Sequence, residues 1–449
     1  MTIVISDRKY CDGMIRRDAL RVGAASLFGT SFSLPQLLAG QAKSPAMTRY
    51  ASAQSLIIVF LEGGLSTIDT WDMKPQAPSE YRGEFQPIST SVPGVQICEH
   101  LPQLSTQMDK FALVRSFGHS DSGHVSADHF MLTGYRTEGG FNGNNRPNNQ
   151  KPSYGASLSR SLGPAGSVPP YVCLPKMHRS SGASHLGTSY APFVIAADPN
   201  APDFEVPDLM PPLEVASSRL GRRKQVLEAV NRYSRRVESM ANRNAHAFDL
   251  YQHNAFSLMT SQATKEAFDI NCEADEMRDA YGRNSLGQSC LMARRLVEAG
   301  VRCVMIDHSN WDTHFNNFEV LKTDLLPKLD AAMSTLFRDL HYRGMLESTL
   351  VLVTGEFGRT PKVNKNAGRD HWGPSTTIAI GGGGVQGGTI VGASDEHAAR
   401  PATSPYGPTD LAATVFHCFG IDLKTEFHTA EGRPIALVPN EGRVIRELF

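Results

Sequence analysis

The sequence predicts an α/β protein with a doubly wound, mostly parallel sheet that carries helices on both faces. Two observations predict this class. Short, continuously apolar runs recur along the chain, as expected of strands that are buried on both sides. Amphipathic helical patterns lie between several of these runs, and short turns join helix to strand.

The predicted strands are apolar segments bounded by polar or turn-forming residues. They are 55–61, 111–114, 171–174, 301–306, 349–354 and 377–380. The first of them, SLIIVFL, runs directly into Glu62-Gly63-Gly64. In open α/β sheets, ligands bind at the carboxyl ends of the strands, so the residues that follow each strand are candidate site residues.

Helices are predicted where apolar residues repeat every three or four positions. A helix over 286–299 is expected to stop at Gly300, a favourable residue for a helix C-terminus. A charged helical stretch near 214–265 is predicted to be an inserted hairpin beside the sheet, and 136–153 is predicted to be a surface loop. The clearest apolar spacing is that of Leu326, Leu329, Met333, Leu336 and Leu340.

Residues 1–42 are predicted to be a twin-arginine export signal, which leaves 43–449 as a single domain. Arg16-Arg17 precede a weakly apolar run from Val22 to Leu38, and the small residue Ala42 suits a cleavage point. The signal implies contact with the twin-arginine export machinery and a periplasmic or otherwise exported protein. The alternative is an ordinary amphipathic helix. No segment is long and apolar enough to predict a stable membrane span.

The composition excludes some partners. A formal net charge of −1 gives no reason to expect binding to nucleic acid. The cysteines beyond the signal have no CxxC spacing and stand in apolar or helical contexts, so they are predicted to be free structural thiols. They are Cys98, Cys173, Cys272, Cys290, Cys303 and Cys418.

Histidines and carboxylates gather after four of the predicted strands. Imidazole and carboxylate together suit zinc, manganese or iron, so the sequence predicts a divalent metal site with one or two ions. The four groups are Glu62 with Ser66, Asp69 and Asp72; His119, Asp121, His124, Asp128 and His129; Asp307, His308, Asp312 and His314; and Glu356, Arg359, Asp370 and His371.

Several of these segments resemble the bacterial DUF1501 family, a domain of unknown function. The family is grouped with alkaline phosphatases, sulfatases and cofactor-independent phosphoglycerate mutases. This grouping implies an alkaline phosphatase-like fold and suggests a two-metal site. The matching stretches are 63–75, Leu132-Thr133-Gly134-Tyr135, 293–301, Trp311-Asp312-Thr313-His314, 355–361 and Gly368-Arg369-Asp370-His371-Trp372.

The resemblance implies particular metal ligands. Asp312 and His314 resemble an Asp and a His on a late loop of the superfamily, and His371 resembles its last histidine. Glu356 stands where the superfamily has an Asp-His pair, and Glu62 takes the place of a first-strand Asp.

The position of the superfamily nucleophile is occupied differently here. In sulfatases the nucleophile lies ten residues before the glycine of a Leu-Thr-Gly ending, and that position is His124. The alternatives are a serine nearby (Ser120, Ser122 or Ser126), a metal-bound water, a phosphohistidine, or loss of the chemistry. His124 and His129 are alternatively extra metal ligands.

The leading hypothesis is an exported, metal-dependent hydrolase of phosphate or sulfate esters of small molecules or glycans. Arg359 would neutralise the ester oxygens, or alternatively form a structural bridge to Glu356. Ser66, Asp69 and Asp72 are possible further ligands, or residues that fix a turn. The remaining expected metal-site residues are Asp312, His314, Glu356, Asp370 and His371, with His124, His129 and Glu62 close by.

Two alternatives stay open at this point. One is a non-catalytic exported binding protein that retains the hydrolase fold, which the missing hydroxyl nucleophile favours. The other is a structural envelope component, which does not explain why histidines and carboxylates collect at strand ends. Phosphate and sulfate are both tetrahedral oxyanions that need the same donors, so the sequence does not separate them.

Overall fold

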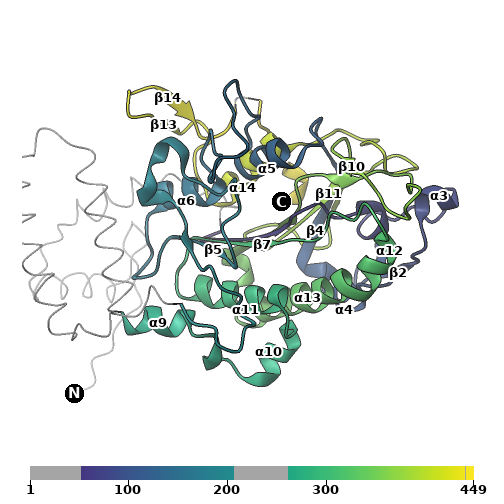
Figure 1. Ribbon diagram of the computed structural model, residues 1–449, viewed down its shortest axis with the longest axis horizontal. Helices are drawn as coiled ribbons and strands as arrows, with labels where there is room; N and C mark the ends of the chain where they lie inside the picture. The colour runs from purple at the N-terminus through teal and green to yellow at the C-terminus, as the bar shows by residue number, and fades with distance from the viewer. Residues whose placement is uncertain (1–51, 207–260, 440) are drawn as a thin grey trace, which may run out of the picture. The chain divides into compact units, whose positions relative to one another are not determined.

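The computed structural model describes residues 52–206, 261–439 and 441–449. Its centre is a sheet with the strand order β12-β4-β11-β8-β1-β7-β5-β6, and helices cover both faces of the sheet (Figure 1). The strands of this sheet are β1 (Ser55–Leu61), β4 (Phe111–Phe117), β5 (Tyr171–Leu174), β6 (Phe193–Val194), β7 (Cys303–His308), β8 (Thr349–Thr354), β11 (Thr376–Gly381) and β12 (Ile390–Val391).

Three two-stranded sheets stand beside the central one. They pair β2 (Pro87–Ser89) with β3 (Gln96–Cys98), β9 (Gly358–Arg359) with β10 (His371–Trp372), and β13 (Glu426–His428) with β14 (Pro434–Ala436). The α-helices are α3 (Ser79–Arg82), α4 (Pro102–Ser105), α5 (His124–Thr133), α6 (Tyr154–Leu162), α9 (Gln262–Phe268), α10 (Asp275–Tyr281), α11 (Ser285–Glu298), α12 (Asn317–Val320), α13 (Leu326–Tyr342) and α14 (Pro408–Cys418).

The central sheet is mixed but mostly parallel. β1 pairs in parallel with β7 on one side, where Leu56 faces Cys303, and with β8 on the other. β5 and β6 continue the parallel set, whereas β11 is antiparallel to both β4 and β8. The predicted class, an α/β fold with a mostly parallel sheet and helices on both faces, is confirmed.

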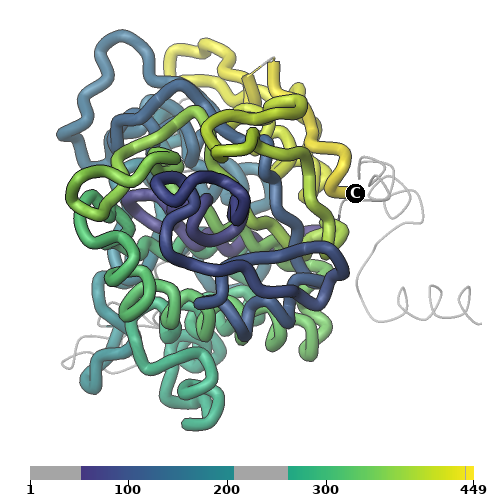
Figure 2. Tube along the Cα trace, turned by 90° about the vertical axis from the view of Figure 1, so that its right-hand side faces the viewer, coloured from purple at the N-terminus to yellow at the C-terminus, as the bar shows by residue number. Residues whose placement is uncertain are grey.

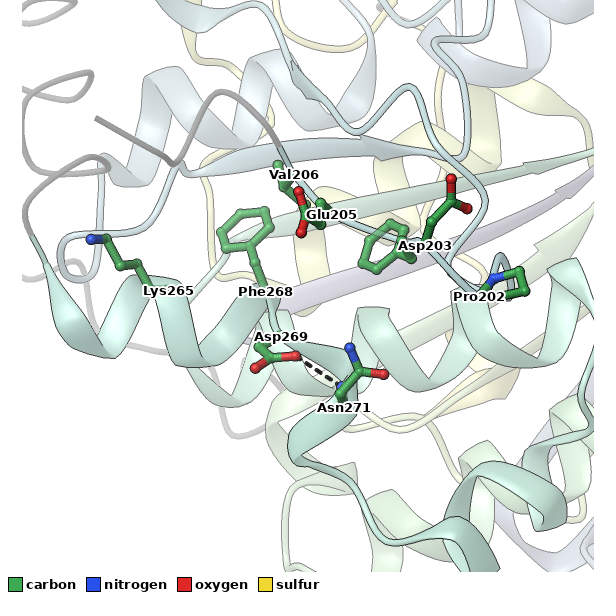
Figure 3. A pocket seen from close by; sticks show the side chains of 9 residues that line it. Pro202, Asp203, Glu205, Val206, Lys265, Phe268, Asp269 and Asn271 are labelled. Atoms are coloured by element: carbon green, nitrogen blue, oxygen red, sulfur yellow. Dashed lines mark hydrogen bonds between the residues drawn. The ribbon is translucent and has the colours of Figure 1, made fainter. Parts of the chain in front are cut away.

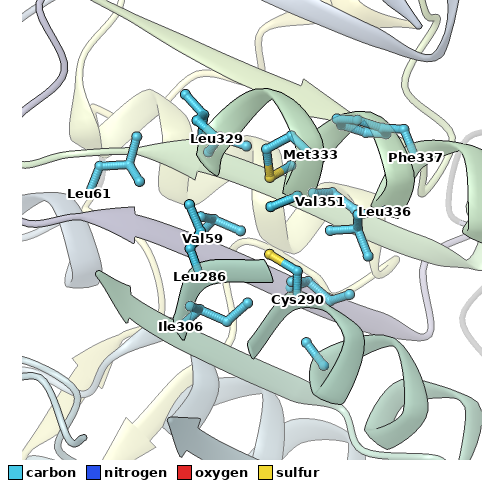
Figure 4. Close-up of a cluster of buried hydrophobic side chains, with 14 of the residues drawn as sticks. Val59, Leu61, Leu286, Cys290, Ile306, Leu329, Met333, Leu336, Phe337 and Val351 are labelled. Carbon is cyan, nitrogen blue, oxygen red and sulfur yellow. The ribbon is translucent and has the colours of Figure 1, made fainter. Parts of the chain in front are cut away.

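The alternation of side chains along β1 explains the two faces. Ile57, Val59 and Leu61 belong to a core that they share with α11 and α13, part of which Figure 4 shows. Leu56 and its alternate neighbours on β1 belong to a second core, which α5, α6 and α14 cover. All seven residues of β1 are buried, which is why this strand is a continuous apolar run in the sequence.

The observed elements differ from the predicted ones mainly at their ends. The strand predicted at 301–306 begins at Cys303 and continues through Asp307 and His308, because Asp307 is buried beside the Lys176 ammonium group. The two-residue strands β6 and β12 are too short to give an apolar run. The predicted signal at 1–42 and the hairpin near 214–265 lie outside the described residues, apart from 261–265 at the start of α9.

The described residues contain no helix that is long and apolar enough to cross a membrane. Their cysteines are free thiols, and five of the six are buried, as predicted. The sixth, Cys272, is exposed.

Truncation of a side chain in the larger core is expected to destabilise the protein. Leu336 on α13 is fully buried, so Leu336→Ala should lower the free energy of unfolding by about 2–5 kcal/mol. Urea denaturation followed by circular dichroism measures the loss. Tyr342→Ala at the exposed end of the same helix is the control and should change the value by less than about 0.5 kcal/mol.

Candidate metal centre

The candidate site lies at the edge of the sheet where the parallel strands end. Asp312 follows β7, Glu356 follows β8, and α5 begins at His124 after β4. Because β11 is antiparallel, it begins at this edge, and His371 precedes it by a few residues. Figure 2 shows purple segments from the start of the described chain beside green segments from its later part. At the candidate site, the backbone N–H of Gly63 donates to the Glu356 carboxylate, 293 residues later.

Three imidazole rings direct their Nε2 atoms toward one carboxylate, that of Asp312. The Nε2 atoms of His371 and His314 lie 3.0 and 3.2 Å from Asp312 Oδ1. The Nε2 atom of His124 lies 3.4 Å from Asp312 Oδ2. The Nε2 atoms of His314 and His371 are 3.0 Å from each other. We refer to these four residues as the histidine cluster.

The Nδ1 atoms of the same rings each contact an oxygen that accepts a hydrogen bond. The acceptors are Glu356 Oε1 for His124 at 2.6 Å, Asp370 Oδ1 for His314 at 2.6 Å, and the backbone oxygen of Ser122 for His371 at 3.0 Å. Since carboxylate and carbonyl oxygens only accept, each Nδ1 carries a hydrogen. Metal-binding histidines are usually held in this way, because the bond at one ring nitrogen orients the other toward the ion.

The donor set and its spacing fit a divalent metal ion. Ligand atoms of His124, Asp312 and His371 all lie within 4.8 Å of one another, and Nε2 of His314 is in contact with two of these residues. Zinc binds imidazole nitrogen at about 2.0–2.1 Å, so two ligand nitrogens of one ion stand about 3 Å apart. Two ring nitrogens whose lone pairs face each other at 3.0 Å need a proton or a metal ion between them.

The charges within the cluster are strongly coupled. Hydrogen bonds to Asp312 and Glu356 raise the pKa of His124 to about 10. Although burial opposes it, the hydrogen bonds from His124 and His371 hold the pKa of Asp312 well below its usual range. The positive charge of the protonated His124 ring therefore balances the negative charge of Asp312. A cation bound at the same place would balance it equally.

Glu356 is fully buried and holds the His124 ring of the cluster through a hydrogen bond. Its carboxylate accepts the backbone N–H of Gly63 at 3.0 and 3.1 Å in addition to the bond from His124. Gly63 has φ of +108°, and a Cβ atom there would lie 2.3 Å from the backbone nitrogen of Asp312. Glycine is therefore required for the loop after β1 to approach the loop after β7.

Arg359 is buried and holds Asp312 in place. Its guanidinium donates to Asp312 Oδ1, to the backbone oxygen of Gly63, and to the backbone oxygens of Trp311 at 3.3 Å and Arg369 at 3.2 Å. The sequence left two roles open for Arg359, neutralising the ester oxygens or a structural bridge to Glu356; the ion pair in the structure is with Asp312 instead of Glu356. Arg359, which is 3% exposed, thus orients the Asp312 carboxylate of the cluster.

His129 lies outside the histidine cluster, although the sequence suggested it as a ligand. Its Nδ1 atom donates to the backbone oxygen of Tyr135 at 3.0 Å. Its Nε2 atom accepts the backbone N–H groups of Gln150 and Lys151 at 3.1 and 3.3 Å. Burial lowers the pKa of His129 to about 4, so the neutral ring ties α5 to the loop that follows it.

Glu62 also bonds to partners outside the cluster. Its Oε2 atom accepts from Lys176 Nζ at 2.9 Å and from Ser309 Oγ at 2.8 Å. Although burial opposes it, these bonds lower the pKa of Glu62 to about 2. The Lys176 ammonium thus stands beside the first-strand carboxylate, where the resemblance suggested a metal ion.

Asp69 and Ser66 form a buried network below the site. The guanidinium of Arg369 donates to the two carboxylate oxygens of Asp69 at 2.7 and 2.8 Å. Ser66 and Asn317 donate to Asp69 Oδ2 at 2.6 and 2.9 Å. Both side chains of the ion pair are fully buried, which supports the structural alternative for Asp69.

Asp72 has structural partners as well. It pairs with Lys74 at 3.0 Å and with Arg115 at 3.5 Å, and it accepts the hydroxyl of Ser394. Its side chain is almost fully buried. These bonds fix the chain near the turn that contains Lys74, as the sequence alternative proposed.

Removal of Asp69 should destabilise the fold, because it leaves the buried charge of Arg369 without a partner. Asp69→Ala is expected to lower the free energy of unfolding by about 3–5 kcal/mol. Urea denaturation of the metal-free protein measures the change. A loss below about 1 kcal/mol would contradict a structural role for this pair.

A family model described as "Protein of unknown function (DUF1501)" matches residues 53–449. The chain belongs to this family. The resemblance seen in the sequence is thereby confirmed at the level of the family. No curated protein matches the chain.

Solved structures show distant similarity to this DUF1501 chain. The PsFucS1 sulfatase from Pseudoalteromonas sp. has 14% identity and a TM-score of 0.35, with 90% of this chain and 72% of that chain covered. The phosphonate monoester hydrolase SpPMH from Silicibacter pomeroyi has 11% identity and a TM-score of 0.31, with 87% and 76% covered. A mutant TAB5 alkaline phosphatase with magnesium bound has 13% identity and a TM-score of 0.32, with 78% and 96% covered.

A second group of titratable residues in this DUF1501 chain joins two carboxylates from the predicted groups, Asp128 and Asp307, to two residues that the sequence analysis did not single out, Lys176 and His178. Lys176 and His178 follow β5, Asp307 is the penultimate residue of β7, and Asp128 lies one turn after His124 on α5. The Nε2 atom of His178 is 3.5 Å from Asp128 Oδ2, and Lys176 Nζ is 3.4 Å from Asp307 Oδ2. The rule that site residues follow strands, applied to 171–174, would have found Lys176 and His178.

Burial governs the protonation of this second group. It raises the pKa of Asp307 to about 7, with the charge of Glu62 adding to the shift. It also raises the pKa of Asp128 well above its usual range, together with the charge of Glu356. Burial lowers the pKa of His178 to about 3.

The Asp307 shift makes a prediction about pH. The folded pKa of about 7 exceeds an unfolded value of about 3.9, so the folded state binds the proton more tightly. This contribution to stability is complete below about pH 4 and is lost as the pH rises to about 7. Asp307→Asn removes this pH-dependent contribution. The melting temperature of the variant should therefore rise relative to that of the wild type between pH 4.5 and pH 7.5.

Differential scanning calorimetry of the metal-free proteins measures this difference. The exposed Asp422→Asn is the matched control and should follow the wild type at both pH values. If the difference in melting temperature between Asp307→Asn and the wild type stays constant with pH, the raised pKa of Asp307 is contradicted.

A separate pocket lies between α9 and the segment 202–206, as Figure 3 shows. Phe204 and Phe268 line it together with charged and amide side chains. None of the residues of the histidine cluster contributes to its lining, so this pocket is distinct from the candidate metal centre.

Proposed function

We propose that this protein is an exported, metal-dependent hydrolase of phosphate or sulfate esters. The observation that supports it most is the histidine cluster, where three Nε2 atoms surround the Asp312 carboxylate. Each ring is held through Nδ1 by an oxygen acceptor, an arrangement typical of metal ligands. Buried histidines that only stabilise a fold do not need to converge in this way.

We infer a site for one divalent ion, zinc, manganese or iron, held by His124, Asp312, His314 and His371. When bound, such an ion supplies a Lewis acid that polarises the ester and lowers the pKa of a coordinated water. The bonds of Glu62 with Lys176 and Ser309 favour one ion rather than two, since the ammonium group already balances that carboxylate.

The protein's own residues would position this chemistry. Glu356 and Asp370 hold the rings of His124 and His314, and Arg359 holds Asp312. These supports leave the ligand atoms little freedom, which lowers the cost of ordering them when an ion binds.

A substrate can reach the cluster from solvent. The side chains of Asp312, His124 and His314 are 38%, 34% and 33% exposed, although Glu356 beneath them is fully buried. A hydrolytic site needs solvent-exposed ligands so that an ester and water can enter.

The nucleophile that the proposal favours is water. Ser120 accepts from Arg136, Ser122 accepts from the backbone of Gly373, and Ser126 donates to a backbone oxygen. Within the described residues, none of these three hydroxyls donates to a histidine or a carboxylate, so none has the base that activates a serine.

The absence of an activated serine among the described residues also supports a second candidate, a non-catalytic exported binding protein that retains the hydrolase fold. Such a protein would keep the metal and bind an anionic ligand without turnover. Turnover separates the two candidates, because both predict metal binding and only the first predicts release of phosphate or sulfate.

Export is proposed from the sequence alone. Arg16-Arg17 and the weakly apolar run that follows are typical of a twin-arginine signal. Export through that machinery would place the protein in the periplasm or outside the cell.

Loss of a ligand should remove the metal and the activity together. We expect about one divalent ion per chain in the purified wild type and its loss in His124→Ala and His371→Ala, because each variant removes one of four ligands. Glu356→Gln should keep the ligands but weaken metal affinity by about 10–100-fold. Elemental mass spectrometry measures the metal, and para-nitrophenyl phosphate and sulfate report hydrolysis.

His428→Ala, at an exposed position on β13, is the matched control and should retain both metal and activity. Metal that persists in both ligand variants would place the ion elsewhere. Stoichiometric metal in a wild type that hydrolyses none of a broad set of esters would select the binding protein.

A further inference from the structure

A large hydrophobic side chain is exposed at the position that directly follows one residue of the histidine cluster in the chain. Among the described residues, the exposed large hydrophobics are Phe315, at 63%, and Tyr342, at 81%. Phe315 directly follows the cluster residue His314 in the chain, whereas Tyr342 ends helix α13. Burial of a phenylalanine ring is favourable, so a ligand that covers the exposed ring of Phe315 would gain that free energy.

The backbone on both sides of Phe315 is fixed. The side chain of Asn364 donates to the backbone oxygen of His314 at 3.1 Å. The backbone N–H groups of Asn316 and Asn317 donate to the backbone oxygens of Asn366 and Ala367, at 3.1 and 2.9 Å. The loop that contains Phe315 is thus hydrogen-bonded to the loop 364–367 on both sides of Phe315.

Two further features show how closely these loops are packed. Asn316 adopts a left-handed conformation with φ of +50°, which an asparagine tolerates better than most residues. A Cβ atom at Gly368 would lie 1.9 Å from the backbone oxygen of His314, so the second loop approaches the first without a side chain between them. The ring of Phe315 is therefore carried on a backbone that is held in one position.

We propose that Phe315 determines specificity by stacking against a sugar ring in the alcohol part of the ester. This inference rests on the proposed function, since it concerns the substrate of the same site. The metal centre recognises the charged ester group, and the alcohol attached to that group must lie next to it. Phe315, one residue after His314 in the chain, would supply a flat apolar face for that alcohol.

The surroundings favour a sugar over a purely apolar alcohol. A sugar has an apolar C–H face that packs on an aromatic ring and hydroxyl groups at its edge. The two loops carry exposed polar side chains: Asn316 follows Phe315 in the chain, and Lys365 precedes Asn366, whose backbone oxygen accepts the N–H of Asn316. An amide and an ammonium group can bond to sugar hydroxyls, whereas they would be poor neighbours for an alkyl chain.

The test compares esters that share the charged group but differ in the alcohol. Binding to metal-loaded protein is measured by calorimetry, and turnover by released phosphate, for glucose 6-phosphate, phenyl phosphate and methyl phosphate. Phe315→Ala should raise Kd and KM for glucose 6-phosphate about tenfold, with kcat changed less than about twofold. Methyl phosphate should be unaffected.

Two variants serve as controls. Phe315→Trp should restore binding of glucose 6-phosphate, because it keeps a planar face. Tyr342→Ala removes the other exposed aromatic ring and should behave as the wild type with every ester. Because both side chains are largely exposed, melting temperatures of all variants should stay close to that of the wild type.

The possible outcomes distinguish this inference from the proposed function. Equal weakening of sugar and methyl esters, or no change in either, would overturn the role of Phe315 while leaving hydrolysis intact. An effect on phenyl phosphate without one on glucose 6-phosphate would overturn the assignment to sugars. A wild type that binds glucose 6-phosphate without turnover would refute hydrolysis, and the binding data would still decide the role of Phe315. No binding of any ester would overturn both.

Discussion

The rest of the site depends on the carboxylate of Asp312. It lies on a loop, yet its two oxygens contact side chains from α5, β9 and β10 as well as from its own loop. A buried guanidinium such as that of Arg359 needs an anion close by, and Asp312 is that anion. The same carboxylate is the centre on which the three imidazole rings converge. One charge therefore sets the positions of a buried cation and of the ring nitrogens proposed to bind a metal.

Close backbone approach makes this convergence possible. Gly63 lets the loop after β1 contact the backbone of Asp312, and Gly368 lets a later loop contact the backbone of His314. Both glycines fall in the stretches through which the sequence resembles its family. The glycine content of those stretches thus has a physical cause, since side chains there would hold the ligand-bearing loops apart.

Much of the fold and part of the site could be predicted from the sequence. Strands such as β1 and β8 are apolar throughout because both of their faces are buried, and polar residues at their ends meet at one edge. The sequence could not separate Asp312 from Glu356 and Asp370, because all three are carboxylates at that edge and differ only in which ring nitrogen they contact. The separation of His124 from His129 was within reach, since five helical residues place two side chains about 140° apart.

The balance of charge explains why a cation fits this edge of the sheet. Asp312 belongs to the histidine cluster, Glu356 and Asp370 contact it, and Glu62, Asp307 and Asp128 lie in the adjoining group. Within the described residues, the guanidinium and ammonium groups that pair with these six carboxylates are those of Arg359, Lys176 and Arg179. Burial, with the charges of neighbouring carboxylates, raises the pKa values of Asp307 and Asp128, and hydrogen bonds to Asp312 and Glu356 raise the pKa of His124. A divalent ion at the histidine cluster would supply positive charge where the ring nitrogens converge, and its binding would displace the proton that His124 holds in the metal-free protein.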